Sequence, residues 1–185
     1  MHYPLCIILT VLVFPIFSPL QANAANELHD QSVEPPSPFS SALKTLQGQI
    51  NHTFQDIGLL RRAMTHASYS EENNKALSVL GTFIIETSVS LHYLRKNIDI
   101  SGKDLSRRVA EISKVNSSCA VDAMRLGLHK VIRVSPKTDS SAPAVVCSGF
   151  RAIFGAVAID TGKSDDAKKV FWYVHGSDIG RAVAL

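Results

Sequence analysis

The chain has 185 residues, of which 45% are hydrophobic and 19% are charged, a composition that excludes a disordered polypeptide and allows one globular domain. Its net charge is +3. All 19 basic residues lie from Phe39 onward, together with 13 of the 16 acidic residues, because Glu27, Asp30 and Glu34 come earlier. This mild basic bias permits a polyanionic partner without requiring one.

The N-terminus reads as a targeting segment. Leu5–Leu20 is almost entirely apolar and contains two prolines, and Ala22–Ala24 follows with the small-x-small pattern that signal peptidase accepts. We expect a cleaved signal peptide over residues 1–24, entry into the secretory pathway or export, and no membrane contact after cleavage. A signal anchor or an organellar address is the alternative. Residues 25–38 are polar and proline-rich, which predicts a linker.

Helical spacing of apolar residues continues from Phe39 to the C-terminal region, and no stretch alternates as a strand would. The sequence therefore predicts an all-α domain of six or seven helices over residues 39–176, with a flexible tail at 177–185. We expect Asp56 and Asp104 to cap helices at their N-termini, and Gly127 and Thr161-Gly162 to end them. The expected helices cover residues 39–50, 56–66, 74–94, 104–126, 149–160 and 164–174.

The helix expected over Asn74–Leu94 is the longest. Its apolar residues recur at steps of three and four and predict one buried face. The residues of this face are Leu77, Leu80, Ile84, Ile85, Ser88, Leu91 and Leu94.

Two cysteines remain once the signal segment is removed. Cys119 and Cys147 lie 28 residues apart, which is not a zinc-ligand spacing. They form a disulfide if the compartment is oxidising, or are two buried thiols if it is not. Two N-x-[ST] triplets, at Asn51 and Asn116, are glycosylation candidates, and Asn116 is the poorer acceptor because it falls inside an expected helix.

Two separated motifs resemble those of ribonuclease III domains. Ala63–Tyr69 reads AMTHASY and Asn74–Thr82 reads NKALSVLGT, and near the end Ser148–Ala156 reads SGFRAIFGA, followed by Asp160 and Gly162. The family patterns are ALTHxSY, NExLExLGD and DxxEAxxGA with an acid and a glycine after it. The resemblance covers Phe39 to Val174 and is nearest to the short plant type that carries an N-terminal targeting segment.

The acidic positions of the family motifs carry other residues in this chain. Members of the family cut double-stranded RNA with divalent metal, usually Mg²⁺, held by carboxylates, and hydroxyl or cationic side chains cannot replace that charge. We therefore expect no catalytic residues, no metal, no cofactor and no enzymatic activity. The five replaced positions are Lys75, Ser78, Thr82, Ser148 and Arg151.

The family dimerises through its long helix with a bulky aromatic at the position of Val79 here, so a homodimer through Asn74–Leu94 is plausible but looser. We expect no separate double-stranded-RNA-binding domain, because only eleven residues follow Val174. Any RNA binding would come from basic residues of the next helix. The alternative interpretation of these residues is an ordinary solvent-exposed helix face. These RNA-binding candidates are Lys103, Arg107, Arg108 and Lys114.

Three functions remain open from the sequence. The first is a catalytically degenerate ribonuclease III-like domain that binds structured RNA or a protein partner in RNA processing. The second is an active endoribonuclease with a displaced site, for which Glu86 is the one acid on the right helix face. The third is a lumenal structural protein without an RNA role, which the signal segment and the two sequons favour.

Overall fold

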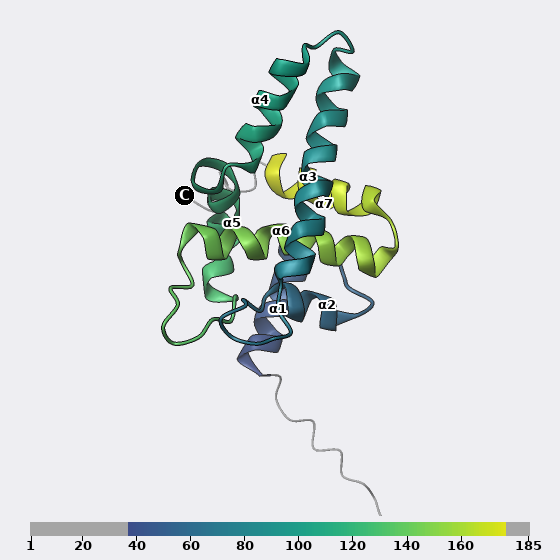
Figure 1. Ribbon diagram of the computed structural model, residues 1–185. Coiled ribbons are helices and arrows are strands. Elements are labelled where there is room, and N and C mark those ends of the chain that lie inside the picture. Colours follow the sequence, from purple (N-terminus) through teal and green to yellow (C-terminus); the bar gives the residue numbers. More distant parts are fainter. Residues whose placement is uncertain (1–36, 177–185) are drawn as a thin grey trace, which may run out of the picture. The chain divides into compact units, whose positions relative to one another are not determined.

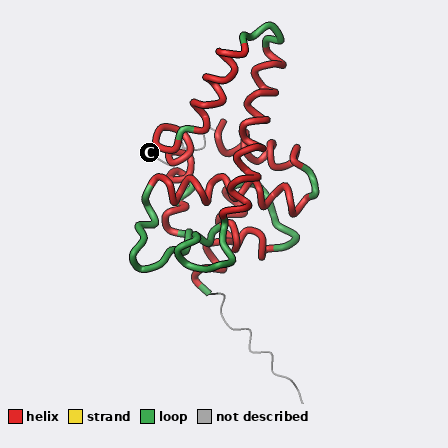
Figure 2. The backbone as a smooth tube through the Cα atoms, viewed as in Figure 1, coloured by secondary structure: helices red, strands yellow, loops and turns green. Residues whose placement is uncertain are grey.

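The computed structural model describes residues 37–176, so the segments predicted to be a signal peptide (1–24) and a tail (177–185), and nearly all of the predicted linker (25–38), lie outside the described residues. The described part contains seven α-helices and no strand, which confirms the all-α prediction (Figures 1 and 2). The helices are α1 Pro38–Gln49, α2 Ile57–Ala63, α3 Lys75–Lys96, α4 Gly102–Ser113, α5 Ala120–Arg125, α6 Pro143–Thr161 and α7 Ser164–Gly176, with a π-helical segment at Val115–Cys119 and a 3₁₀ turn at Leu128–Lys130.

Helix α6 is the centre of the core. Eleven of its residues are buried, from Val145 to Val157, because its sequence is apolar on nearly every face. Helix α3 crosses it, and α2, α5 and α7 pack around it (Figure 1). The length and hydropathy of α6 would also suit a membrane span, but most of its apolar stretch is covered by the other helices of this domain.

The crossing of α3 and α6 depends on two glycines. A Cβ atom at Gly81 would lie 1.8 Å from the carbonyl oxygen of Arg151, and a Cβ at Gly155 would lie 2.1 Å from that of Leu77. The two backbones therefore touch where these glycines meet, which no larger residue permits. This contact fixes how the family motif on α3 faces the family motif on α6.

Several helix ends follow the sequence signals. Asp56 caps α2 by accepting the N–H of Gly58, while Gly127 and Gly162 end helices with φ of +69° and +68°. The predicted cap at Asp104 is wrong. The cap is Ser101, whose hydroxyl accepts the Asp104 N–H and donates to the Asp104 carboxylate, a reciprocal arrangement that moves the helix start earlier.

The single helix predicted over residues 104–126 is also wrong, because α4 stops at Ser113 and Lys114 is extended with ψ of 125°. The run Asn116-Ser117-Ser118 has side chains that compete with helical hydrogen bonds, which favours a break. A π-helical turn follows, and a disulfide joins its last residue, Cys119, to Cys147 of α6.

One residue predicted to face inward, Leu91, is exposed, at 37%. Leu91 is exposed because the C-terminal half of α3 pairs with α4 in a hairpin that extends past α6 (Figure 1), so fewer helices cover it there. No residue of α4 is fully buried, although Val109 and Ile112 pack against the core.

Candidate functional site

The five replaced family positions lie on α3 and α6, on either side of the glycine crossing. Lys75 is the first residue of α3 and is exposed. Ser78 and Thr82 follow one and two turns later, and the Thr82 hydroxyl donates to the Ser78 carbonyl oxygen at 2.9 Å. The Thr82 side chain therefore makes an ordinary helix-internal bond.

Ser148 on α6 is held from two sides. Its hydroxyl donates to the Val145 carbonyl oxygen at 2.8 Å and accepts the side-chain amide of Asn74 at 3.2 Å. Asn74 is buried, and the same amide nitrogen also donates to the Ala63 carbonyl oxygen at 3.3 Å. Asn74 does stand at the start of α3, as expected, but its side chain links three segments instead of capping the helix.

Arg151 occupies the second acidic position on α6. Its guanidinium donates to the Ser113 carbonyl oxygen at 2.7 Å, and the Ser113 hydroxyl donates to Glu86 at 3.1 Å. Arg151 thus ties the end of α4 to α6, and Glu86 is already engaged. The cavity beside Arg151 and Thr82 measures about 10 Å³, which is room for about one water molecule.

This donor set does not fit Mg²⁺. The ion requires about six oxygen ligands in a rigid octahedron, usually with carboxylate charge among them. Here the hydroxyls of Thr82 and Ser148 are committed to backbone carbonyls, and Lys75 and Arg151 are cationic. Across residues 37–176, no three histidine, cysteine or acidic side chains gather as a metal site would require.

His66, which matches the upstream family motif, makes local contacts. Its Nδ1 accepts the Ser68 N–H at 3.1 Å and lies 2.9 Å from the Ser68 hydroxyl. Burial, with a smaller contribution from the nearby Lys75 charge, lowers the pKa of His66 below its ordinary value. We therefore interpret His66 as a neutral imidazole with a local structural role, which is to order its own turn.

The acid that the motif retains, Asp160, is structural. Its carboxylate, with 1% of the side chain exposed, accepts the backbone N–H groups of Gln55 and Asp56 and pairs with His52 at 3.2 Å. Burial alone would raise the pKa of Asp160, but the bonds from Asp56, Gln55 and His52 outweigh burial and hold that pKa below its ordinary value. Asp160 thereby fixes the loop between α1 and α2.

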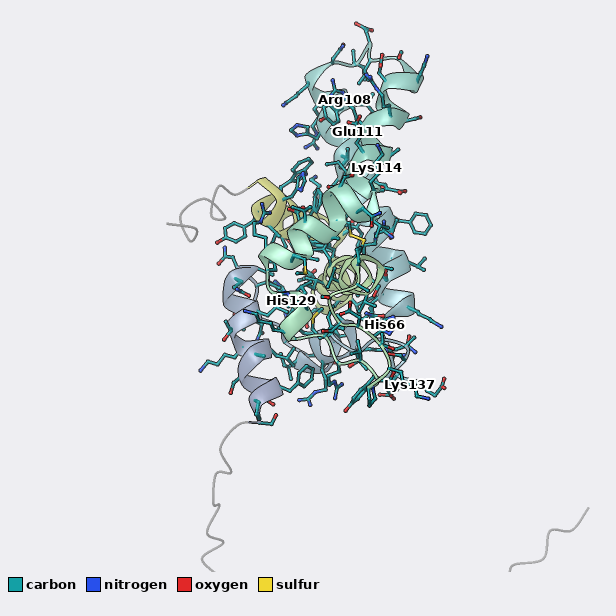
Figure 3. All side chains as sticks on the ribbon, turned by 90° about the vertical axis from the view of Figure 1, so that its left-hand side faces the viewer. His66, Arg108, Glu111, Lys114, His129 and Lys137 are labelled. Atoms are coloured by element: carbon teal, nitrogen blue, oxygen red, sulfur yellow. A yellow bond between two sulfur atoms is a disulfide. The ribbon has the colours of Figure 1, made fainter. Side chains whose placement is uncertain are left out.

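The four RNA-binding candidates form a basic stripe on α4 and at its C-terminal end (Lys103, Arg107, Arg108 and Lys114), and this stripe is exposed but partly neutralised. Arg107 pairs with Asp104 at 2.8 Å, not with Glu111, and the Arg108 guanidinium lies 4.6 Å from the Tyr93 ring centre. Figure 3 shows Arg108, Glu111 and Lys114 in order along α4, so an acid interrupts the stripe. Lys103 and Lys114 make no ion pair within the described residues and are its free charges.

Both sequons are accessible. Asn51 is exposed directly after α1 with φ of +52°, and Asn116 is exposed in the π-helical segment, not in a regular helix.

A second basic surface was missed by sequence reasoning. Arg95 and Lys96 end α3 beside Lys168 of α7, and only the adjacency of Arg95 and Lys96 in the sequence hinted at it.

The fold and its two facing motifs define a ribonuclease III-like domain. The profile of the family described as ribonuclease-III-like matches residues 56–174, and the chain belongs to that family. It is 56% identical over 182 residues to Protein NUCLEAR FUSION DEFECTIVE 2 of Arabidopsis thaliana, with 98% of this chain and 95% of that protein covered, which confirms the plant type expected from the sequence.

Bacterial relatives are more distant. The chain is 30% identical over 141 residues to Ribonuclease 3 of Delftia acidovorans, covering 74% of this chain and 62% of that enzyme. Among solved structures, the nuclease domain of ribonuclease III from Campylobacter jejuni superposes with a TM-score of 0.69 at 25% identity, covering 74% of this chain and 98% of that one; its description refers to a flexible region involved in dimer formation.

Proposed function

We propose that this protein is a ribonuclease III-like domain that binds structured RNA without cutting it. The observation that carries the proposal is Arg151, which stands at a family acid position and donates its guanidinium to the Ser113 carbonyl oxygen. A cation that ties α4 to α6 supplies no carboxylate ligand and repels a divalent metal ion at this position. The nearby acids are already engaged within the fold, since Glu86 accepts the Ser113 hydroxyl and Asp122, which lines the cavity beside Arg151, pairs with Arg125.

Binding rests on the exposed charges of α4. Lys103 and Lys114 stand near its two ends, and Arg108 lies between them on the ring of Tyr93. A 12-residue helix with such charges can contact phosphates across the minor groove of an RNA duplex. A protein partner in RNA processing is the competing ligand for the same face.

A duplex RNA assay tests both parts of the proposal, that the chain binds the duplex and that it does not cut it. We expect the purified chain to shift a labelled duplex and leave it intact in Mg²⁺ or Mn²⁺ at enzyme excess. Lys103→Gln/Lys114→Gln should weaken binding and flatten its salt dependence by roughly one to two log–log units, as two lost phosphate contacts require. Lys44→Gln/Lys163→Gln, two exposed lysines away from α4, is the matched control.

Two results contradict the proposal. Duplex cleavage that disappears in Glu86→Ala would reveal an active, displaced site. No salt-dependent binding of duplex RNA at all would instead favour a structural or protein-binding role.

We also infer a homodimer through α3. Its outer face carries Val79 and Phe83 at 58% and 62% exposure, large apolar side chains that a second copy of the same helix would cover. The family's aromatic side chain is replaced by Val79, so less apolar area is available for burial than in relatives that keep it.

We further infer passage through the secretory pathway. The Cys119–Cys147 disulfide persists only in an oxidising compartment, and Asn51 is open to a glycosyl transferase. A chain isolated from plant cells should lose mass on treatment with an N-glycosidase; Asn51→Gln should reduce that loss, and Asn51→Gln/Asn116→Gln should abolish it. Recovery of an unmodified wild-type chain with free thiols from a mitochondrial or plastid fraction would overturn this localisation.

A further inference from the structure

A groove runs between the C-terminal half of α3 and helix α7, which packs against α3 and crosses behind it in Figure 1. It holds about 270 Å³ and continues into an adjoining hollow of about 190 Å³ that shares Leu91 and Lys168 with it. The 270 Å³ groove alone lies near the lower end of the range of roughly 300–1,000 Å³ that small-ligand sites occupy, and the adjoining hollow, which Phe83 also lines, belongs to the α3 face proposed for the dimer. The groove lies on the α7 side of α3, whereas the RNA-binding candidates lie on α4.

Three cations and no acid line this groove. Arg95 and Lys96 are exposed in the last turn of α3 and make no ion pair within the described residues. Lys168 reaches in from α7, with 21% of its side chain exposed, and its partner Asp165 lines the adjoining hollow, with 77% of the carboxylate side chain in solvent. An exposed pair of that kind is weak and yields readily to a better anion.

Aromatic side chains also line the groove. The ring of Trp172 lies 4.7 Å from the ring of His92 with a 32° tilt, and Phe171 supports Trp172 at 5.0 Å. Burial and the neighbouring Lys96 charge lower the pKa of His92, so this ring is neutral at pH 7 and offers a flat polar surface. Leu91 adds an apolar edge.

Cations beside flat rings match the chemistry of a nucleotide. Phosphate oxygens pair with guanidinium and ammonium groups, and a base stacks or packs on aromatic side chains whatever its identity. An RNA duplex hides its bases and is too wide for a groove of this volume. An acidic peptide would satisfy the cations but would leave the ring surface without a matching partner.

We propose that the α3–α7 groove binds a nucleotide unit, with its phosphate held by Arg95, Lys96 and Lys168 and its base against Trp172. The unit is a free nucleoside monophosphate or part of a single RNA strand. The site is independent of the duplex-binding role assigned to α4.

Trp172 is the only tryptophan of the chain and therefore reports directly on this groove. The full chain is titrated with an octauridylate strand, with uridine monophosphate and with inorganic phosphate while tryptophan fluorescence is followed. We expect saturable quenching by the strand and weaker or no response to phosphate alone. Equal affinity per site for monophosphate and strand assigns the groove to free nucleotide, and a clear preference for the strand assigns it to RNA.

Matched charge variants locate the binding. Arg95→Gln/Lys96→Gln should weaken strand binding about tenfold and flatten its salt dependence by roughly 1.4 log–log units, about 0.7 per lost contact. Lys44→Gln/Lys137→Gln removes the same charge from two exposed lysines that lie outside both α4 and the groove, and should leave strand binding unchanged. Trp172→Phe, followed by polarisation of a labelled strand, should weaken binding several-fold.

The proposal fails if both double variants weaken binding equally, since that would indicate diffuse attraction to a basic protein. It also fails if strand binding is unaffected by Arg95→Gln/Lys96→Gln with circular dichroism intact, or if polyglutamate competes as well as the RNA strand. None of these results depends on duplex binding. If α4 proves not to bind duplex RNA, the test of the α3–α7 groove therefore remains valid.

Discussion

The absence of a side chain at Gly81 sets the distance between the two central helices. A methyl group there would overlap the Arg151 carbonyl oxygen, an atom of α6 backbone that cannot move without moving the helix. Arg151 also carries the bond to Ser113, so a shift at this crossing would pull on the end of α4 as well. Arg151 thus couples the crossing of α3 and α6 to the position of α4.

We expect Gly81→Ala to lower the free energy of unfolding by about 3 kcal/mol, the upper range of overpacking costs, because backbone meets backbone. Gly48→Ala is the control. Gly48 lies in α1 with nothing within 4 Å of the added Cβ, so alanine should raise the free energy of unfolding by about 0.5–1 kcal/mol through helix propensity. Urea unfolding of both variants measures the difference, and equal stabilities would show that α3 and α6 do not touch in solution.

At the scale of the element, the sequence predicts what is local. The caps at Ser37 and Asp56 and the left-handed glycines at 127 and 162 are decided within one turn, and all four lie at helix ends. The break after Ser113 is different, because the group that takes its carbonyl oxygen is Arg151, 38 residues away. Periodicity alone continues a helix through such a point.

In the candidate sites, too, the sequence predicted local features but not long-range contacts. The replaced acids were visible in the sequence because motif spacing is local, but the new partners of Ser148 and Arg151 were not. The basic stripe was found from its spacing, since Lys103 and Arg107 are four residues apart and Arg107 and Lys114 are seven apart. The sequence did not determine that Arg107 pairs with Asp104. The α3–α7 groove required knowing that Lys168 and Trp172 return to the end of α3, which only the tertiary fold determines.

For the whole molecule, the decisive question is whether two copies join along α3. Val79 and Phe83 are one turn apart and together form an exposed apolar strip on a helix whose other face is buried against α6. A twofold axis across this strip would place each copy's Phe83 against the other's apolar residues. Since valine replaces the family's aromatic at position 79, the dimer should be weak.

Phe83→Asp should abolish self-association, because a carboxylate would be buried against apolar groups of the second copy. Val79→Phe should tighten the dimer by about tenfold, since added apolar area contributes on the order of 1–2 kcal/mol. Val121→Asp, a change at a 55% exposed residue of α5, is the matched control and should leave association unchanged. Sedimentation velocity over a range of protein concentrations measures all three, and a wild-type chain that stays monomeric at the highest concentration would remove α3 as an interface.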